Sequence, residues 1–177
     1  MTPDKFRYCP QCAMPLATVA RMEDGGEKIR LRCPACDFTH WNNPTPVLAA
    51  VVEYEGQILL ACNAAWSGRM FALITGFMEA GETPQGGIER EISEETALQT
   101  ESLDLIGVYD FQRMNQIIIA YHAVCTGTVS LSPELVEYKL YAPDKVRCWP
   151  AATGYALADW LKSRGHTPEF IAWEKRD

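Results

Sequence analysis

Runs of apolar residues divide most of the chain into predicted strands. Residues 47–54 and 57–62 are almost continuously apolar, and Glu55 and Gly56 between them are typical of a tight turn that joins two strands. Further strands are predicted at residues 71–74, 103–111, 116–125 and 139–141, and residues 126–131 are expected to extend the same sheet.

Other segments repeat apolar residues with the period of an α-helix. Residues 85–96 place isoleucines four positions apart, behind Thr83 and Pro84, which suit the N-cap and the first helical turn. Residues 151–164 have one apolar side, and residues 168–174 predict a last short turn of helix. Strands on both sides of a helix, with a second helix late in the chain, predict an α/β sandwich.

Composition narrows the class of protein. The 177 residues are enough for one domain and a small appendage, and 47% of them are hydrophobic. The sequence shows no run of 18 apolar residues and no apolar N-terminal segment, so we expect a cytoplasmic protein without a membrane span. The formal charge of -7 argues against a broad nucleic-acid-binding surface and leaves room only for a local basic strip.

The helix predicted at residues 85–96 carries an acidic face. Glu91, Glu94 and Glu95 are spaced so that their carboxylates lie on one side, and Arg90 can pair with Glu94 one turn along. Like charges at this spacing destabilise a helix by about 0.2–0.5 kcal/mol per pair, whereas a hard cation with oxygen ligands would turn the repulsion into a binding site. The face is therefore either a solvated surface or a metal site.

Four of the seven cysteines form two Cys-Pro-x-Cys pairs, Cys9 with Cys12 and Cys33 with Cys36. Four thiolates satisfy a tetrahedral zinc ion and leave no open coordination position, which makes a structural site. Two pairs at this spacing favour zinc over a redox dithiol. We expect a zinc ribbon in residues 1–42, built on a hairpin, and a larger domain in residues 43–177.

The acidic helix is part of a longer spaced motif. Gly-x5-Glu-x7-Arg-Glu-Ile-Ser-Glu-Glu runs from Gly76 to Glu95, and Leu98 follows. This resembles the signature box of the Nudix hydrolases at eight of its nine specified positions. The departure is Ala97, because the family has a glycine there, just past the helix end, where the left-handed conformation is favoured. The residues before Gly76 also lack the Pro-Gly pair of many members.

The resemblance implies a Nudix α/β/α sandwich with a mixed sheet. It also implies hydrolysis of a pyrophosphate bond by water activated on Mg²⁺ or Mn²⁺. Glu94 and Glu95 would be metal ligands, and Glu91 would be a ligand or the general base.

The resemblance also implies supporting groups around these three glutamates. Arg90 and Glu82 would orient them, and the Gly76 carbonyl is a further candidate ligand. Residues 137–141, Glu-Tyr-Lys-Leu-Tyr, resemble a family segment of the form Glu-x-x-(aromatic or aliphatic)-aromatic, so Glu137 is the candidate for an outlying metal-binding and catalytic carboxylate. Glu134 competes with it, and either could be a solvated loop residue.

A zinc ribbon directly before a Nudix domain resembles the NADH pyrophosphatases and the plant FAD pyrophosphatases. The chain lacks the Ser-Gln-Pro-Trp-Pro-Phe-Pro segment of the NADH-specific group. The expected substrate is therefore a nucleoside diphosphate linked to another group, such as FAD, ADP-ribose or NAD(H), with release of a nucleoside monophosphate. Resemblance also implies a homodimer.

Aromatic and other singular residues have both structural and functional interpretations. Trp66, Phe77 and Tyr109 could stack on a base or a flavin ring, or could be core residues. His122 lies in an apolar strand and is expected to be half-buried and hydrogen-bonded. The remaining cysteines are expected to be small core residues: Cys62, Cys125 and Cys148.

Two alternatives to a small-molecule hydrolase stay open. One is a non-catalytic regulator that binds a nucleotide on this scaffold and RNA or protein through the ribbon. A regulator would be expected to have lost one of Glu91, Glu94 or Glu95, and all three are present. The other is an enzyme that acts on nucleotide-capped RNA, which binding of short RNA would reveal.

Overall fold

The computed structural model describes residues 6–66 and 68–172. The chain divides into two compact units, Met1–Asn43 and Pro44–Asp177. The boundary falls in the run Asn42-Asn43-Pro44, where a proline and its preceding residue favour extended backbone.

The N-terminal unit is a small antiparallel sheet. Its strands are β1 (Ala17–Glu23), β2 (Gly26–Arg32) and β3 (Thr39–His40), in the order β1-β2-β3. Gly25 and Gly26 both have positive φ, which permits the tight turn between β1 and β2. Among the described residues of this unit, the buried side chains are those of Cys9, Arg32 and Cys33. The ribbon therefore has no apolar core of ordinary kind.

The larger unit is built on a six-stranded mixed sheet. Strand β4 (Thr45–Tyr54) pairs in parallel with β8 and antiparallel with β5 and β6, so it lies in the middle. The strand order is β7-β8-β4-β5-β9, and β6 shares one edge of β4 with β5. The other strands are β5 (Gln57–Asn63), β6 (Ile74–Phe77), β7 (Gln99–Phe111), β8 (Gln116–Thr126) and β9 (Leu135–Tyr141).

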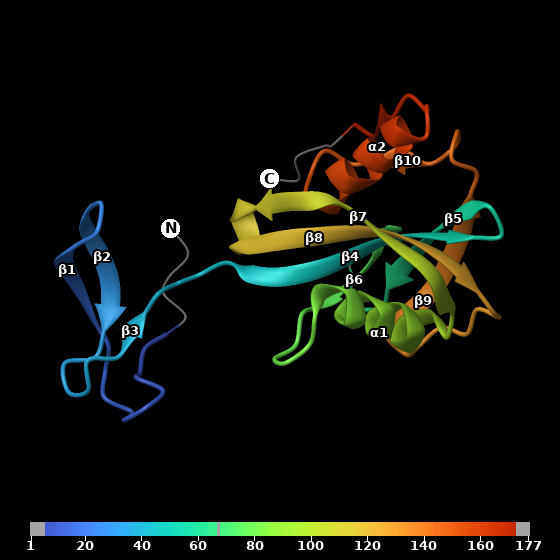
Figure 1. Ribbon diagram of the computed structural model, residues 1–177. Coiled ribbons are helices and arrows are strands. Elements are labelled where there is room, and N and C mark those ends of the chain that lie inside the picture. Colours follow the sequence, from blue (N-terminus) through green and yellow to red (C-terminus); the bar gives the residue numbers. More distant parts are fainter. Residues whose placement is uncertain (1–5, 67, 173–177) are drawn as a thin grey trace. The chain divides into compact units, whose positions relative to one another are not determined.

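One helix covers each face of this sheet (Figure 1). Helix α1 (Pro84–Thr96) packs on one side and α2 (Thr153–Ser163) on the other, and a 3₁₀ turn, η1 (Gln112–Met114), joins β7 to β8. The apolar run of β4 is continuous because both faces of this strand are buried. Leu48 belongs to the core beside α1, and Val51 belongs to the core beside α2. The predicted α/β/α sandwich with a mixed sheet is thereby confirmed.

Three predicted segments differ from the structure. Strand β6 begins at Ile74, where residues 71–74 were expected to be the strand, and it contains Gly76. Residues 127–134 leave the sheet: Gly127 has φ +114°, and the Ser130 N–H donates to the Thr96 carbonyl at the end of α1. A last helical turn was expected at residues 168–174, but Glu169–Phe170 form strand β11, which is parallel to β10 (Arg147–Cys148). Residues 173 and 174 of that prediction lie outside the described range.

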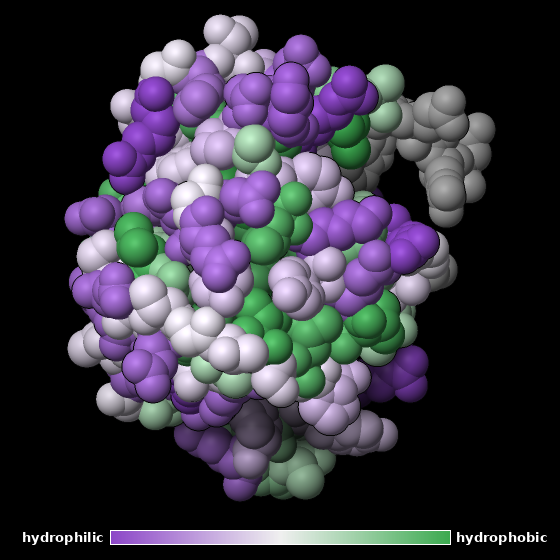
Figure 2. Space-filling model, turned by 90° about the vertical axis from the view of Figure 1, so that its right-hand side faces the viewer, coloured by the Kyte–Doolittle hydropathy of each residue, from purple (hydrophilic) through white to green (hydrophobic). Residues whose placement is uncertain are grey.

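The surface is not uniformly polar. Figure 2 shows a band of apolar side chains that runs across one face between polar groups. Within residues 6–66 and 68–172, no helix combines the length and the apolar composition that crossing a bilayer requires.

Candidate active site

Gly76 brings the sheet into contact with helix α1. It lies in β6 opposite Leu48 of β4, in the centre of the sheet. A Cβ added at this position would overlap the carboxyl group of Glu91. The motif therefore requires glycine at position 76, because the Glu91 side chain occupies the space of a side chain there.

The loop before α1 is held by side-chain hydrogen bonds to its backbone. The Glu79 N–H donates to Glu82 Oε1 at 2.6 Å. Thr83 is the N-cap: its Oγ1 accepts from the Gly86 N–H at 3.1 Å, and Pro84 starts the helix. A Cβ on Gly87 would overlap both Glu82 and the core, so the helix approaches the sheet closely at this turn.

Arg90 connects the acidic residues of the loop and helix. Its Nε and Nη2 donate to Glu82 at 3.2 and 3.1 Å, and its Nη1 donates to Glu91 and Glu94, both at 2.9 Å. A further donation reaches the Phe77 carbonyl at 3.3 Å. The hydrogen bonds from Arg90 lower the pKa of Glu82, and those to the glutamates raise the pKa of Arg90. Arg90 is thus held as a permanent cation that fixes three carboxylates.

Beside Arg90 lies an open cavity of about 520 Å³. Arg90 is the basic residue among the described residues that line it, and the acidic ones are Glu79, Glu91, Glu94, Glu95 and Glu134. The negative charge of this cavity therefore exceeds what the protein's own cation balances. Burial raises the pKa of Glu95 to about 7, and repulsion from Glu91 and Glu134 acts in the same direction. Burial also raises the pKa of Glu91, against the opposing effect of Arg90.

The cavity fits hard divalent cations. Glu95 is only 8% exposed, so its ionised form needs a partner that Arg90 does not supply, since Arg90 contacts the other glutamates of the motif. Carboxylate oxygens are the ligands that Mg²⁺ and Mn²⁺ prefer.

The two outlying glutamates named from the sequence lie in different places. Glu134 lines the acidic cavity. Its segment is attached to α1, because the Ser132 N–H donates to the Glu95 carbonyl at 3.0 Å. Glu137 is on β9, accepts from Arg69 Nε at 2.7 Å, and is not among the described lining residues. The structure therefore brings Glu134, and not Glu137, together with the helix carboxylates.

The three candidate aromatic residues are also separated. Phe77 lines the acidic cavity and is 60% exposed. Trp66 lines a neighbouring apolar cavity. Tyr109 packs towards α2, where its hydroxyl donates to Asp159 at 3.0 Å, so it does not reach either cavity. Sequence reasoning did not single out Trp149 or Arg113 of the apolar cavity, because neither belongs to a spaced motif.

The other residues that the sequence singled out have structural rather than catalytic surroundings. Ala97 adopts the left-handed conformation, with φ 58°, and its N–H donates to the Ser93 carbonyl, so alanine occupies the geometry expected of the family's glycine. His122 is buried rather than half-buried, and its Nε2 lies 2.8 Å from Glu53. Cys62, Cys125 and Cys148 are all buried in the larger unit.

The four N-terminal cysteines form one cluster. Their sulfur atoms all lie within 4.8 Å of one another, and the closest pairs are 3.4 Å apart. Tetrahedral coordination with zinc–sulfur bonds of about 2.3 Å places sulfur atoms ~3.8 Å apart. The cluster is therefore compatible with one zinc ion.

The mixed-sheet fold, the acidic cavity and the cysteine cluster together indicate the protein family. Residues 43–161 match the family model for the NUDIX domain, so the chain belongs to the Nudix hydrolase family. More particularly, residues 7–42 match the model described as "Nudix N-terminal", a zinc ribbon. The chain is thus a Nudix hydrolase with an N-terminal zinc ribbon.

Relatives and solved structures agree with this placement. The crystal structure of a NUDIX hydrolase from Nitrosomonas europaea is 26% identical, has a TM-score of 0.76, and matches over 94% of this chain and 97% of that one. An ADP-ribose pyrophosphatase from Streptococcus suis, 17% identical with a TM-score of 0.58 over 73% of this chain and 100% of that one, shares the fold.

Curated relatives include proteins named NAD-capped RNA hydrolase NudC. The one from Vibrio parahaemolyticus is 29% identical over 67% of this chain and 43% of its own length. The one from Pseudomonas aeruginosa is 23% identical over 85% of this chain and 52% of its own length. The chain therefore spans about half the length of these relatives.

The pKa of Glu95 predicts how stability depends on pH when no Mg²⁺ or Mn²⁺ is added. In the folded protein this pKa is raised to about 7, whereas an unfolded glutamate titrates near ~4.3. The stabilising contribution of a raised-pKa acid is complete below the unfolded value and lost as pH rises through the folded value. We therefore expect Tm of the zinc-loaded protein to fall between about pH 5 and pH 8.

A Glu95→Gln variant isolates this effect, because it should flatten that part of the profile. The hydrogen bond from Lys162 lowers the pKa of Asp159, so Asp159 titrates below the window and Asp159→Asn should leave the slope unchanged. Parallel thermal profiles for the wild type and Glu95→Gln would contradict the expectation.

Proposed function

We propose that the protein is a metal-dependent hydrolase that cleaves the pyrophosphate bond of a nucleoside diphosphate linked to another group and releases a nucleoside monophosphate. Candidate substrates are FAD, ADP-ribose and NAD(H). The observation that carries the proposal is the cavity with Glu91, Glu94, Glu95 and Glu134 on its wall and Arg90 as its described cation. Such a wall repels a bare pyrophosphate, so binding requires divalent cations between protein and substrate.

The cations are Mg²⁺ or Mn²⁺ in this proposal, held by Glu91, Glu94, Glu95 and the Gly76 carbonyl. Glu134 supplies the outlying carboxylate, because it lines the same cavity. When bound, the metal lowers the pKa of a coordinated water and stabilises charge on the phosphate oxygens. A structural zinc ion is proposed at Cys9, Cys12, Cys33 and Cys36.

The protein's own groups position the reaction. Arg90 and Glu82 hold the helix carboxylates in place through the hydrogen bonds described above. Water forms a bond to one phosphorus, and the bridging oxygen leaves with the other phosphate. A carboxylate that is not bound to metal accepts the proton from water, so whichever candidate serves as the base does not also bind a cation. Glu91, Glu94 and Glu137 are the sequence candidates, of which Glu91 and Glu94 line the cavity.

A second candidate substrate class is nucleotide-capped RNA. It is favoured by the relatives named NAD-capped RNA hydrolase NudC, which match over about half their length. None of the seven cysteines, all within the described residues, forms a disulfide, which fits the cytoplasmic setting that we propose. A homodimer is also part of the proposal.

The test is a hydrolysis panel of nucleotide conjugates with Mg²⁺ and with Mn²⁺, with products identified by mass. We expect release of AMP from at least one adenine-containing conjugate, and none without a divalent cation. The same assay decides between the outlying glutamates: Glu134→Gln should lower kcat/KM about 10–100-fold, and Glu137→Gln less than about threefold. The reverse order would return the role to Glu137, and no hydrolysis of any conjugate would overturn the proposed function.

A further inference from the structure

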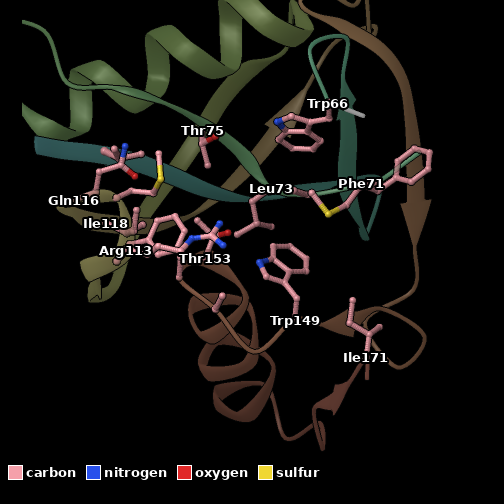
Figure 3. A pocket seen from close by; sticks show the side chains of 17 residues that line it. Trp66, Phe71, Leu73, Thr75, Arg113, Gln116, Ile118, Trp149, Thr153 and Ile171 are labelled. Carbon is pink, nitrogen blue, oxygen red and sulfur yellow. The ribbon is translucent and has the colours of Figure 1, made fainter. Parts of the chain in front are cut away.

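Next to the acidic cavity lies a second, mainly apolar cavity of about 350 Å³. Figure 3 shows the Trp66 ring on one side of Leu73 and the Trp149 ring on the other, with Ile171 beyond Trp149. Trp66 belongs to the loop after β5, and Trp149 follows β10, so segments far apart in the sequence form the two walls.

The two cavities adjoin each other. Val47, Thr75 and Gln116 line both of them. A small cavity is lined both by Trp66 of the apolar cavity and by Glu95 of the acidic cavity. A group attached to a pyrophosphate that lies over the α1 carboxylates can therefore extend directly into the apolar cavity.

The apolar cavity has two chemically different ends. At one end are Trp66, Trp149 and Leu73, which offer flat or aliphatic surfaces. At the other end, Figure 3 shows Arg113, Gln116 and Thr153, which offer hydrogen-bond donors. Of the described residues that line this cavity, Arg113 carries the charge and none is a carboxylate.

We propose that this cavity holds the isoalloxazine ring of a flavin dinucleotide, and that Trp66 and Trp149 determine specificity for that ring. The inference rests on the proposed function and names its preferred substrate, FAD. The ring is flat and uncharged, with an apolar dimethylbenzene end for the tryptophans. Its other end bears carbonyl oxygens that accept hydrogen bonds, which suits the guanidinium of Arg113 and the amide of Gln116.

The same surfaces disfavour the other candidate groups. The pyridinium ring of NAD⁺ is a cation, and it would enter a cavity whose described charge is the Arg113 guanidinium. Adenine presents hydrogen-bonding atoms around its edge, and the tryptophan end would leave them without partners. ADP-ribose ends in a ribose and offers no second aromatic ring for the tryptophans. The expected order of kcat/KM is FAD above NADH, and NADH above NAD⁺ and ADP-ribose.

The first test measures binding of the ring alone, without turnover. Riboflavin has no phosphate, and stacking on tryptophan quenches its fluorescence. Trp66→Ala should raise the Kd for riboflavin at least about tenfold, the loss expected when one stacking partner is removed, and Trp66→Phe should retain binding within about threefold. Trp41→Ala, an exposed tryptophan of the ribbon, is the matched control and should bind like the wild type.

The second test measures selectivity in the presence of Mg²⁺. We expect wild-type kcat/KM for FAD to exceed that for ADP-ribose at least about tenfold, and Trp66→Ala to move this ratio towards one. Arg113→Ala should lower the ratio of FAD to NAD⁺. Equal wild-type rates for FAD and ADP-ribose, or riboflavin affinity unchanged in Trp66→Ala, would overturn the inference and leave the pyrophosphatase function standing. Absence of hydrolysis for every conjugate would instead contradict the proposed function. The riboflavin titration would still show whether the apolar cavity binds the flavin ring.

Discussion

Replacing Glu95 by glutamine should lower kcat/KM for the preferred conjugate about 10³-fold while the protein stays folded. Glutamine has the shape of glutamate but cannot supply a negative oxygen to a divalent cation. Loss of one group that stabilises transition-state charge typically costs 10²–10³-fold. Glu95 is buried beside other carboxylates, so removal of its charge should leave the Tm of the metal-free protein unchanged or higher.

The measurement compares steady-state kinetics with affinity for Mn²⁺ in the same variant. Weaker Mn²⁺ binding together with lower kcat/KM would be expected of a ligand. Glu89→Gln, a substitution on the same helix that neutralises a glutamate outside the described cavity lining, is the matched control and should keep near wild-type rates. Full activity of Glu95→Gln would remove the proposed metal site.

The second large effect is expected in the ribbon. Cys33→Ser should abolish zinc binding and unfold residues 6–43, because the buried side chains described in this unit are two of the four cysteines and Arg32. The larger unit has its own cores on both faces of its sheet, so it should remain folded.

Zinc content per chain and limited proteolysis of the full-length protein measure this outcome. The variant should contain no zinc and should be cleaved within the ribbon, with a stable fragment of residues near 44–172 remaining. Cys148→Ala, at a buried cysteine of the larger unit, should keep one zinc ion per chain. A zinc-loaded, protease-resistant Cys33→Ser protein would show that this thiolate is not a ligand.

The parts of the site that lie on one helix could be predicted from the sequence. Spacing along a helix fixes which side chains share a face, so the sequence alone places Glu91, Glu94 and Glu95 together, and all three line the acidic cavity. The spacing of the motif likewise singles out Gly76. The reason for a glycine there, contact with the Glu91 carboxyl group, depends on how closely the helix approaches the sheet, which spacing does not specify.

Parts that depend on pairing between distant strands could not be predicted. The ladder between β5 and β9 shifts register between Cys62 and Asn63, so Leu135 pairs with Asn63 while Glu137 pairs with Cys62. A shift of one residue exchanges the faces on which side chains lie, and a single sequence does not encode where the bulge falls. The resemblance to a family segment favoured Glu137, whereas the position of Glu134 in the acidic cavity depends on long-range backbone contacts of its segment, which a single sequence does not specify.

The segment around Glu134 has a mechanical consequence. Its backbone is fastened on one side to the last turn of α1, through Ser132 and the Glu95 carbonyl. On the other side the Ala64 N–H donates to the Glu134 carbonyl at 2.8 Å, next to the loop that carries Trp66. Backbone hydrogen bonds thereby connect three segments: the end of α1, residues 132–134, and the loop after β5. If α1 and Trp66 have the roles proposed above, substitutions in the segment around Glu134 are expected to change the rate of hydrolysis and the substrate selectivity together.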